Sequence, residues 1–368
     1  MRPQAYLSRA TSPAFNLAWE DFLLRTAPQA TPVCFLYQNS PCVVVGKNQN
    51  VWGEVDPGAM RQGAVPVVRR NSGGGTVYHD LGNTNFSFHI PRADFVRSTH
   101  TDMVAHALAS PPISLPPRFA RPPVFRNERN DLVVYAANAS DAHPDALRKI
   151  SGSSYKIAGQ RAYHHGTLLL HANLARIRYL RRTPRVAMES RGVDSVPSPV
   201  ANLQETFAAH APMLQHTVVA RAICDAFFAA YGAGDVIEVD ETALPTTAQS
   251  GTRTECARAI FDEIRSWKWV YGANPDLCVH VDAQEHHFPL APTLALALNV
   301  QRGTVAHVHA TGVDSTCRAM QSALASLHGE RYDALATAPP SDVPFSRSAL
   351  RDGSSAQRAL WQWLHTVL

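Results

Sequence analysis

The stretch from Arg69 to His89, RRNSGGGTVYHDLGNTNFSFH, constrains the fold of this chain more than any other part of the sequence. Three consecutive glycines, Gly73 to Gly75, carry no Cβ, so the backbone can take positive φ and a ligand can lie against bare amides. Two arginines precede the glycines, and an alternating apolar run over 83–88 follows them. The pattern predicts a strand, a loop that binds a carboxylate or phosphate, and a second strand.

Two better-known glycine loops do not fit this stretch. It lacks the Lys-Ser/Thr pair that follows the glycines of a P-loop, and it lacks a G-x-G-x-x-G at the start of a helix. A second block, KISGSSYKIAGQRAYHHGTLLLHANL, spans 149–174. The two blocks, in this order, resemble the two motifs of the lipoate-protein ligase A and lipoyltransferase family, in the form of its eukaryotic, fungal-like members.

The resemblance implies an α/β (α+β) fold with two domains. A catalytic domain of the biotin/lipoate-ligase type, with a mixed sheet flanked by helices, is expected over 1–240, with insertions near 110–125 and 136–148. A polar linker over 241–254 then leads to a smaller C-terminal α+β accessory domain over 255–368.

The activity implied by the resemblance is that of a lipoate-protein ligase. Lipoate, or octanoate, would be activated by ATP with Mg²⁺ to an acyl-adenylate and transferred to a lysine of apo lipoyl domains, namely 2-oxoacid dehydrogenase E2 subunits and the glycine cleavage H protein. An ATP-independent lipoyltransferase, using lipoyl-AMP or a lipoylated carrier protein, is the alternative. Pro197 favours the alternative, because bacterial ligases commonly carry an arginine in the loop that the block 189–203 resembles.

Lys149 is the predicted catalytic residue. Negative charge accumulates on the α-phosphate and later on the acyl oxygen during acyl activation and transfer, and a fixed ammonium group stabilises both. The resemblance places the active-site lysine of the family at this position, directly before Ile150-Ser151-Gly152.

The ATP and acyl-adenylate site is expected around the glycine loop and before Lys149. Arg70 is expected to contact phosphate. Asp131 either orients the acceptor amine or a magnesium ion, or only closes a turn at the entry of a strand, and the sequence leaves both open. The predicted residues are Arg70, Ser72, Gly73, Gly74, Gly75, Thr76, Val77, Tyr78, Asn130, Asp131 and Lys149, with no metal bound other than Mg²⁺ with ATP.

An apolar tunnel is expected for the lipoyl tail. Its predicted lining is Val44, Asn85, Phe86, His165 and Gly166. His164 and His165 are interpreted as part of the floor of the site rather than as bases, and His79-Asp80 as a turn. Asn48 and Gln49 either bind a ligand or satisfy the backbone of their own turn.

Composition narrows the function classes. Of 368 residues, 45% are hydrophobic and 17% charged, which is typical of a soluble globular protein, and no apolar run is long enough to span a membrane. The net charge of +4 is too small for a nucleic-acid footprint. Six scattered cysteines without a C-x-x-C predict neither a zinc site nor a disulfide framework. The start, MRPQAYLSRAT, has arginines and no acid, which favours the mitochondrion over the cytoplasm as location.

Three other functions fit less well. A biotin ligase would carry an arginine- and glycine-rich motif where SGGG stands, and a thioester-forming octanoyltransferase would need a cysteine between Cys42 and Cys224. A binding protein without catalysis would not need both the glycine loop and Lys149.

Local patterns predict several elements. Ser12-Pro13 predicts the start of a helix, and the runs 33–37 and 42–45 predict the two strands of a hairpin. Further helices are expected over 57–62 and 93–108.

Overall fold

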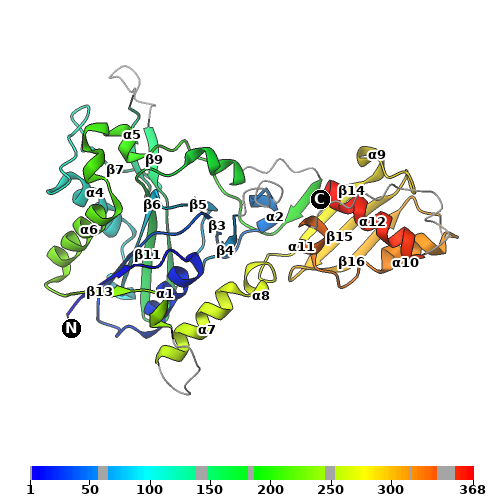
Figure 1. Cartoon of the computed structure of the whole chain (residues 1–368), viewed down its shortest axis with the longest axis horizontal. Helices are drawn as coiled ribbons and strands as arrows, with labels where there is room; N and C mark the ends of the chain where they lie inside the picture. Colours follow the sequence, from blue (N-terminus) through cyan, green and yellow to red (C-terminus); the bar gives the residue numbers. More distant parts are fainter. Residues whose placement is uncertain are drawn as a thin grey trace. The chain divides into compact units, whose positions relative to one another are not determined.

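The computed structural model describes residues 2–56, 65–137, 147–180, 186–244, 253–314, 316–337 and 353–368. The chain forms two compact units (Figure 1). The N-terminal unit comprises Met1–Lys47, Pro66–Ile177 and Ser195–Arg265, and the C-terminal unit comprises Asn48–Val65, Arg178–Asp194 and Ser266–Leu368.

A six-stranded mixed sheet forms the centre of the N-terminal unit, in the order β10-β11-β6-β2-β1-β13. Strand β1 pairs in parallel with β2 and β13, whereas β2, β6, β11 and β10 pair antiparallel in succession. The strands are β1 (Gln4–Ser8), β2 (Val33–Tyr37), β6 (Asn83–Pro91), β10 (Ser153–Ala158), β11 (Arg161–Leu169) and β13 (Asp235–Val239).

Helix α1 (Pro13–Thr26) covers one face of this sheet. The Ser12 side chain caps it by accepting a hydrogen bond from the Phe15 backbone N–H, as predicted. Its apolar side packs Phe15 and Trp19 against Phe35 of β2. Helices α4 (Arg97–Ala109) and α6 (His216–Tyr231) pack against the opposite face. The predicted mixed sheet flanked by helices is confirmed.

The predicted hairpin is wrong, because its two strands belong to different sheets. Strand β3 (Cys42–Val45) lies between β4 (Val67–Arg69) and β5 (Val77–His79) in a three-stranded sheet. Both β2 and β3 are buried along their whole length, so each needs partners on both edges. The turn between them is held by the buried Asn16 of α1, whose Nδ2 donates to Gln38 O at 2.9 Å and to Asn39 Oδ1 at 2.9 Å.

A second three-stranded sheet carries the predicted catalytic lysine. It consists of β7 (Phe125–Arg126), β8 (Leu132–Tyr135) and β9 (Leu147–Ser151), all antiparallel. The proline-rich insertion before β7 contains no helix or strand, as its prolines predict. Most of the insertion expected over 136–148, and the helix expected over 57–62, lie outside the described residues.

Shorter elements complete the N-terminal unit. They are η1 (Arg92–Asp94), η2 (Leu174–Leu180, whose last residues belong to the C-terminal unit), α5 (Leu203–Thr206), η3 (Ala208–Met213), η4 (Glu241–Ala243) and α7 (Arg253–Arg265). Helix α7 packs with α1 inside this unit, whereas the sequence placed the start of the accessory domain at residue 255.

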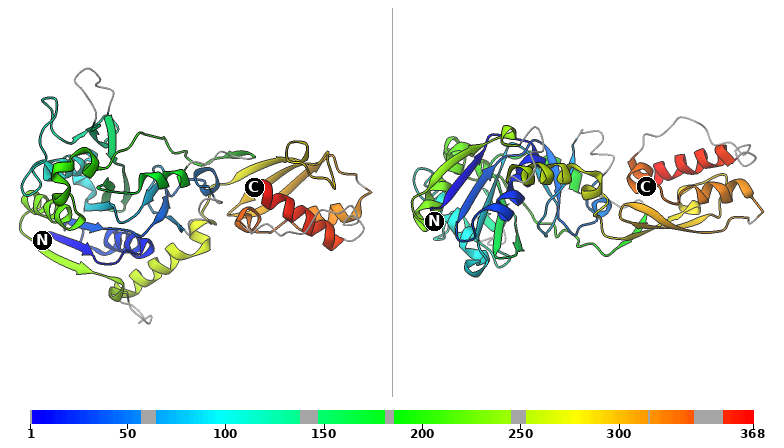
Figure 2. Two further views of the ribbon diagram at one scale, coloured as in Figure 1. Left: turned by 45° about the horizontal axis from the view of Figure 1, so that its top comes forward. Right: turned by 90° about the horizontal axis from the view of Figure 1, so that it is seen from below.

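The C-terminal unit is an antiparallel sheet in the order β12-β14-β15-β16 with helices on one face (Figure 2). Its elements are α2 (Val51–Glu54), β12 (Ala187–Ser190), α8 (Trp267–Val270), β14 (Leu277–Asp282), α9 (Ala283–His286), β15 (Ala295–Gln301), β16 (Thr304–Thr311), α10 (Arg318–Ala325), α11 (Tyr332–Thr337) and α12 (Gly353–Val367). Two of these, α2 and β12, come from chain segments that precede Ser266–Leu368, the largest segment of this unit. Trp52 of α2 stacks on Tyr271 with 5.4 Å between ring centroids, and Asn274 Nδ2 donates a hydrogen bond to Asn50 Oδ1 at 3.0 Å. No helix in the described ranges is long and apolar enough to cross a bilayer.

Candidate active site

Lys149 lies in β9 and forms an ion pair with Asp131, the residue before β8. Lys149 Nζ is 2.9 Å from Asp131 Oδ1, and the side chains are 24% and 9% exposed. Asp131 is held by the turn before it, in which Asn127 Oδ1 accepts from the Asp131 N–H at 2.9 Å. Asn130 takes φ of 61° in this turn, a conformation that asparagine tolerates better than most residues. One carboxylate therefore holds the ammonium group, and the lysine side chain as a whole stays partly exposed.

The backbone around Lys149 is fixed from the other side. Lys149 N–H donates to Pro199 O at 2.9 Å, and Ala201 N–H donates to Lys149 O at 3.1 Å. A Cβ at Gly152 would lie 3.3 Å from both Cε and Nζ of Lys149, so the glycine leaves the space that the lysine side chain occupies. These contacts fix the backbone at Lys149 and leave room for its side chain.

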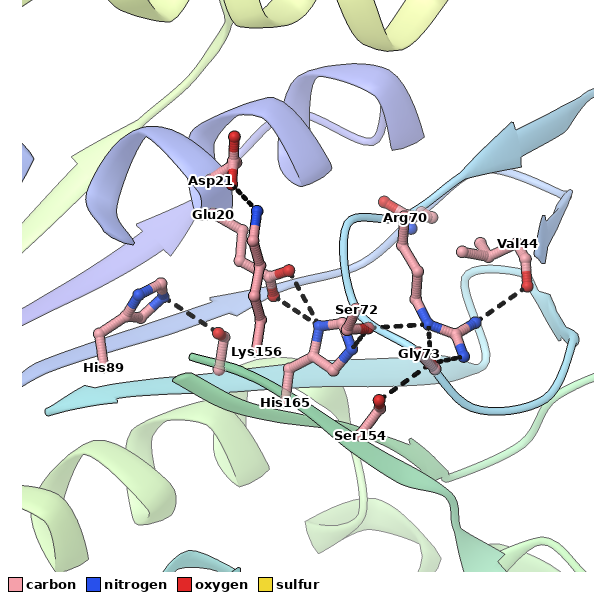
Figure 3. Close-up of polar contacts among 12 residues, drawn as sticks. Glu20, Asp21, Val44, Arg70, Ser72, Gly73, His89, Ser154, Lys156 and His165 are labelled. Atoms are coloured by element: carbon pink, nitrogen blue, oxygen red, sulfur yellow. Dashed lines mark hydrogen bonds and ion pairs between the residues drawn. The ribbon is translucent and has the colours of Figure 1, made fainter. Parts of the chain in front are cut away.

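The buried side chain of Arg70 donates hydrogen bonds to carbonyl groups of the glycine loop (Figure 3). Its Nη2 donates to Gly73 O at 2.5 Å and to Gly75 O at 2.8 Å, while Nη1 donates to Val44 O at 3.2 Å. Arg70 is 5% exposed, and burial lowers the pKa of its guanidinium to about 10, which leaves it charged at neutral pH. These hydrogen bonds fix the loop carbonyls, and the expected contact of Arg70 with phosphate stays a prediction.

Of the three loop glycines, two are required by geometry. Gly74 has φ of 81°, and a Cβ there would lie 3.2 Å from Arg70 Nη2. A Cβ at Gly75 would lie 3.0 Å from Ser195 Oγ, which accepts from the Thr76 N–H at 2.8 Å. Gly73 has no positive φ, and no atom lies within 4 Å of the position that a Cβ would take there. Ser195 is thus the residue that approaches Gly75 most closely, while the predicted approach of a ligand to the loop stays a prediction.

A chain of buried hydrogen bonds lies under the loop (Figure 3). Arg70 Nε and Ser72 Oγ are 2.9 Å apart, Ser72 Oγ and His165 Nε2 are 2.7 Å apart, and His165 Nδ1 lies 2.9 Å from both carboxylate oxygens of Glu20. If His165 is neutral with its proton on Nδ1, it donates to Glu20 and accepts from Ser72, and Ser72 accepts from Arg70. This assignment satisfies every member of the chain, which fixes the start of the loop relative to α1.

Sequence reasoning missed Glu20, Ser154 and Ser195. Ser154 Oγ donates to Gly73 O at 2.9 Å, which ties the second sequence block to the loop of the first. An acidic residue on the apolar side of a helix was the available signal for Glu20, which is 2% exposed. Nothing in the local sequence marks Ser195.

Four of the five residues predicted to line the lipoyl tunnel lie on two faces of the large sheet. Asn85 and His165 share one face of β6 and β11, because they pair with Thr167 and Ser87, and the contact of His165 with Glu20 shows that this face is toward α1. Phe86 and Gly166 pair with each other on the opposite face, where a Cβ at Gly166 would lie 2.3 Å from the Phe86 ring. Val44 is in β3 and contributes its carbonyl to Arg70. The structure does not bring these five residues together.

Other predicted positions have structural contacts. His79 Nδ1 is 3.0 Å from Asn39 Nδ2, and burial lowers the pKa of His79 to about 3. Asp80 accepts from the Gly82 and Asn173 backbone N–H groups at 2.8 and 2.9 Å, so it closes a turn, the interpretation that the sequence favoured. Asn48 and Gln49 belong to the C-terminal unit, where Gln49 Nε2 donates to Val193 O at 3.2 Å.

The remaining loop residues are in β5 or beside it. Tyr78 OH accepts from Arg176 Nη1 at 3.5 Å, Val77 pairs with Val44, and Thr76 is bound by Ser195 as described. Within the described part of the chain, no three His, Cys, Asp or Glu side chains gather as they would to hold a metal ion.

Comparison with known proteins gives one family and several similar structures. The family model "Lipoyl protein ligase A/B catalytic domain" matches residues 12–228. Plasmodium falciparum LipL1 in complex with lipoate aligns over 99% of both chains, with 21% identity and a TM-score of 0.57. A bi-partite lipoate protein ligase of Thermoplasma acidophilum, described with its E2 lipoyl domain, aligns over 73% of this chain and 96% of its own, with 20% identity and a TM-score of 0.54. A lipoate-protein ligase A bound with ATP covers 73% of this chain and 98% of its own, with 20% identity and a TM-score of 0.53. At these identities the matched structures share a fold with this chain.

Proposed function

Because the chain belongs to the lipoyl protein ligase A/B catalytic-domain family, we propose that it is an ATP-dependent lipoate-protein ligase. It activates lipoate or octanoate with Mg²⁺ and ATP, and transfers the acyl group to a lysine of apo E2 lipoyl domains and of the glycine cleavage H protein. The observation that carries the proposal is the Lys149–Asp131 ion pair, because it provides a fixed ammonium group on a side chain that is partly exposed.

The segment Ser195–Ala201 supports the proximity of Lys149 to the loop. Ser195 binds the Thr76 amide, and four residues later Pro199 binds the Lys149 amide, so one short segment contacts both parts. The segment 195–201 therefore links the strand that carries Lys149 to the end of the glycine loop.

In the first half-reaction a carboxylate oxygen of lipoate forms a bond to the α-phosphorus, and the bond to pyrophosphate breaks. ATP supplies this electrophilic phosphorus and the leaving group when it is bound. Lys149 stabilises the charge on the α-phosphate and on the incoming carboxylate, while Asp131 holds the ammonium group in place. In the second half-reaction the amine of the acceptor lysine attacks the acyl carbon and AMP leaves. Lys149 then stabilises the charge on the carbonyl oxygen, and orientation contributes much of the rate.

Similar proteins support the substrates proposed. One is described with lipoate, one with ATP and one with an E2 lipoyl domain. The arginine-containing, acid-free start of the sequence supports a mitochondrial location, with the cytoplasm as the alternative, and imaging of a C-terminal fluorescent fusion would test it.

The test is lipoate-dependent ATP–pyrophosphate exchange, run beside transfer from lipoyl-AMP to an apo E2 lipoyl domain. A ligase performs both reactions. Transfer without exchange would replace the proposal by an ATP-independent lipoyltransferase, and Pro197 in the Ser195–Ala201 segment would then be the departure to examine first.

Lys149→Ala should reduce both reactions by about 10³-fold or more, because it removes the charge that stabilises both transition states. The melting temperature checks that the variant is folded. Lys268→Ala, which removes an exposed lysine from α8, is the control and should retain both activities. Near-normal exchange by a folded Lys149→Ala variant would contradict the assigned role.

A further inference from the structure

The stretch 110–130, here called the arginine segment, carries a local excess of positive charge. It has four arginines and one glutamate, a formal charge of +3, where the whole chain has +4. Six prolines stand among these residues, and no helix or strand forms before β7. Prolines restrict the backbone of such a segment, so it loses less conformational entropy when it binds a partner. The arginines are Arg118, Arg121, Arg126 and Arg129.

Two of the arginines stack on aromatic rings. The Arg121 guanidinium lies 5.8 Å from the ring centroid of Phe125, and that of Arg118 lies 5.5 Å from the ring of Phe119. Both rings contact Tyr135, with 4.9 Å between ring centroids for Phe119 and 5.7 Å for Phe125. Arg118 also donates to the Tyr135 carbonyl at 3.2 Å. The aromatic cluster therefore limits the positions of the guanidinium groups before any partner binds.

The same face of the small sheet carries Lys149. Phe125 pairs with Val133, and Val133 pairs with Lys149, so the three side chains lie on one face of β7, β8 and β9. The opposite face packs Val134 and Ile150 into the apolar core. Phe125, with Arg121 over its ring, thus lies two strands away from Lys149 on the same face.

Arg129 lies in the turn before β8. It stands two residues before Asp131, the partner of Lys149, and is exposed. Within the residues that the structure describes, neither Arg121 nor Arg129 has an acidic partner, whereas Arg126 pairs with Asp102 at 2.9 Å. Two exposed positive charges therefore lie at or next to the small sheet that carries Lys149, without a compensating charge from the described chain.

We propose that the arginine segment is the docking surface for the acceptor protein, and that it binds acidic side chains flanking the target lysine. The proposal rests on the proposed function, which requires a folded protein to bring a lysine amine to Lys149. An acidic surface complements the +3 charge, and docking beside Lys149 places a lysine of that surface close to the acyl group. A free nucleotide is a less suitable occupant, because Arg121 is exposed and lies two strands from Lys149.

The test compares two double variants of the full chain. Arg121→Ser with Arg129→Ser removes the two unpaired charges. Arg2→Ser with Arg221→Ser removes the same charge from exposed arginines elsewhere in the N-terminal unit, whose side chains are 73% and 65% exposed. The substrate is a recombinant apo E2 lipoyl domain, and transfer from lipoyl-AMP and ATP–pyrophosphate exchange are measured separately at low and raised ionic strength.

The first variant should raise the KM for the lipoyl domain about tenfold at low salt, with kcat and exchange unchanged, because exposed charges act on encounter. Salt should raise the KM of the unmodified protein and shift that of the variant less. The control should keep the KM of the unmodified protein. An acceptor in which acids beside the lysine are changed to lysine should lose efficiency with the unmodified protein and regain it with Arg121→Glu.

An unchanged KM in the first variant would overturn the docking proposal. Loss of exchange in that variant would overturn it as well, because the arginines would then bind the nucleotide. A single-stranded oligonucleotide that binds the unmodified protein, but not the variant, and leaves the KM for the lipoyl domain unaffected would assign the segment to nucleic acid instead. If the unmodified protein performs neither exchange nor transfer, the proposed function fails, which is distinct from a failure of docking alone.

Discussion

The two faces of the six-stranded sheet bury different kinds of side chain, although the same strands make both. Toward α1, β6 and β11 present polar groups, including Asn85, Ser87 and His165, and His165 hydrogen-bonds to Ser72 at the start of the glycine loop. Toward α4 and α6 they present Phe86 and Phe88, packed in an apolar cluster. The polar face therefore positions the candidate site, and the apolar face contributes most of the stability.

This division predicts that changes on the two faces separate stability from activity. Phe88→Ala should cost about 4 kcal/mol of unfolding free energy, because it leaves a cavity in the apolar cluster. Exchange activity per folded molecule should stay within about twofold, since Phe88 faces away from the loop. Denaturant unfolding with activity normalised to the folded fraction measures both. A folded variant that loses most of its specific activity would show that the faces are not independent.

The apolar face also contains a pair of histidines whose charge state should make it sensitive to acid. His164 and His100 lie 6.1 Å apart between ring centroids, and burial lowers their pKa values to about 3 and about 4. Both stay neutral in the folded protein, whereas an unfolded histidine binds a proton near pH 6.5. The stability that the two neutral histidines contribute is fully present above about pH 6.5. It is lost as the pH falls toward their folded-state pKa values of about 4 and about 3.

At pH 5 each of these histidines should lower the stability by about 2 kcal/mol relative to pH 7. His164→Leu should remove the part of this loss that is due to His164. Between pH 7 and pH 5 the unfolding free energy of the variant should therefore fall by about 2 kcal/mol less than that of the unmodified protein. Unfolding free energies at the two pH values measure the difference. The same pH dependence in both proteins would contradict the assignment of His164.

The sequence predicted the local elements of both faces better than their arrangement. Ser12 and Pro13 placed the start of α1, because a cap depends on residues next to each other. The hairpin of 33–37 and 42–45 failed, because strand pairing depends on which neighbours are buried, and Asn16 of α1 holds the turn. The same limit applies to the site. Lys149 and the glycines lie in recognisable blocks, whereas Glu20 and Ser195 act through contacts with residues more than 50 positions away in sequence.

Substitutions on the polar face should lower activity more than stability. Glu20→Gln keeps an oxygen that accepts from His165 Nδ1 but removes the charge, so it should cost about 1 kcal/mol of stability. Because Glu20 orients His165, and His165 holds Ser72 and the loop, exchange should fall about tenfold. Asp225→Asn, on the exposed side of α6, is the control and should change neither quantity. Full exchange activity in Glu20→Gln would mean that the loop does not depend on the network.

The smallest effect separates two neighbouring glycines at the end of this network. Gly74→Ala should cost about 1 kcal/mol, because φ of 81° strains any residue with a Cβ, and the new methyl group would lie 3.2 Å from Arg70 Nη2. Gly73→Ala should be nearly neutral, since φ at Gly73 is not positive and no atom lies within 4 Å of its Cβ position. Unfolding free energies and exchange rates of the two variants form a matched comparison. Equal losses at both positions would mean that a bound ligand, rather than the backbone conformation and Arg70, requires the glycines, because a ligand lying against the loop would exclude a methyl group at either residue.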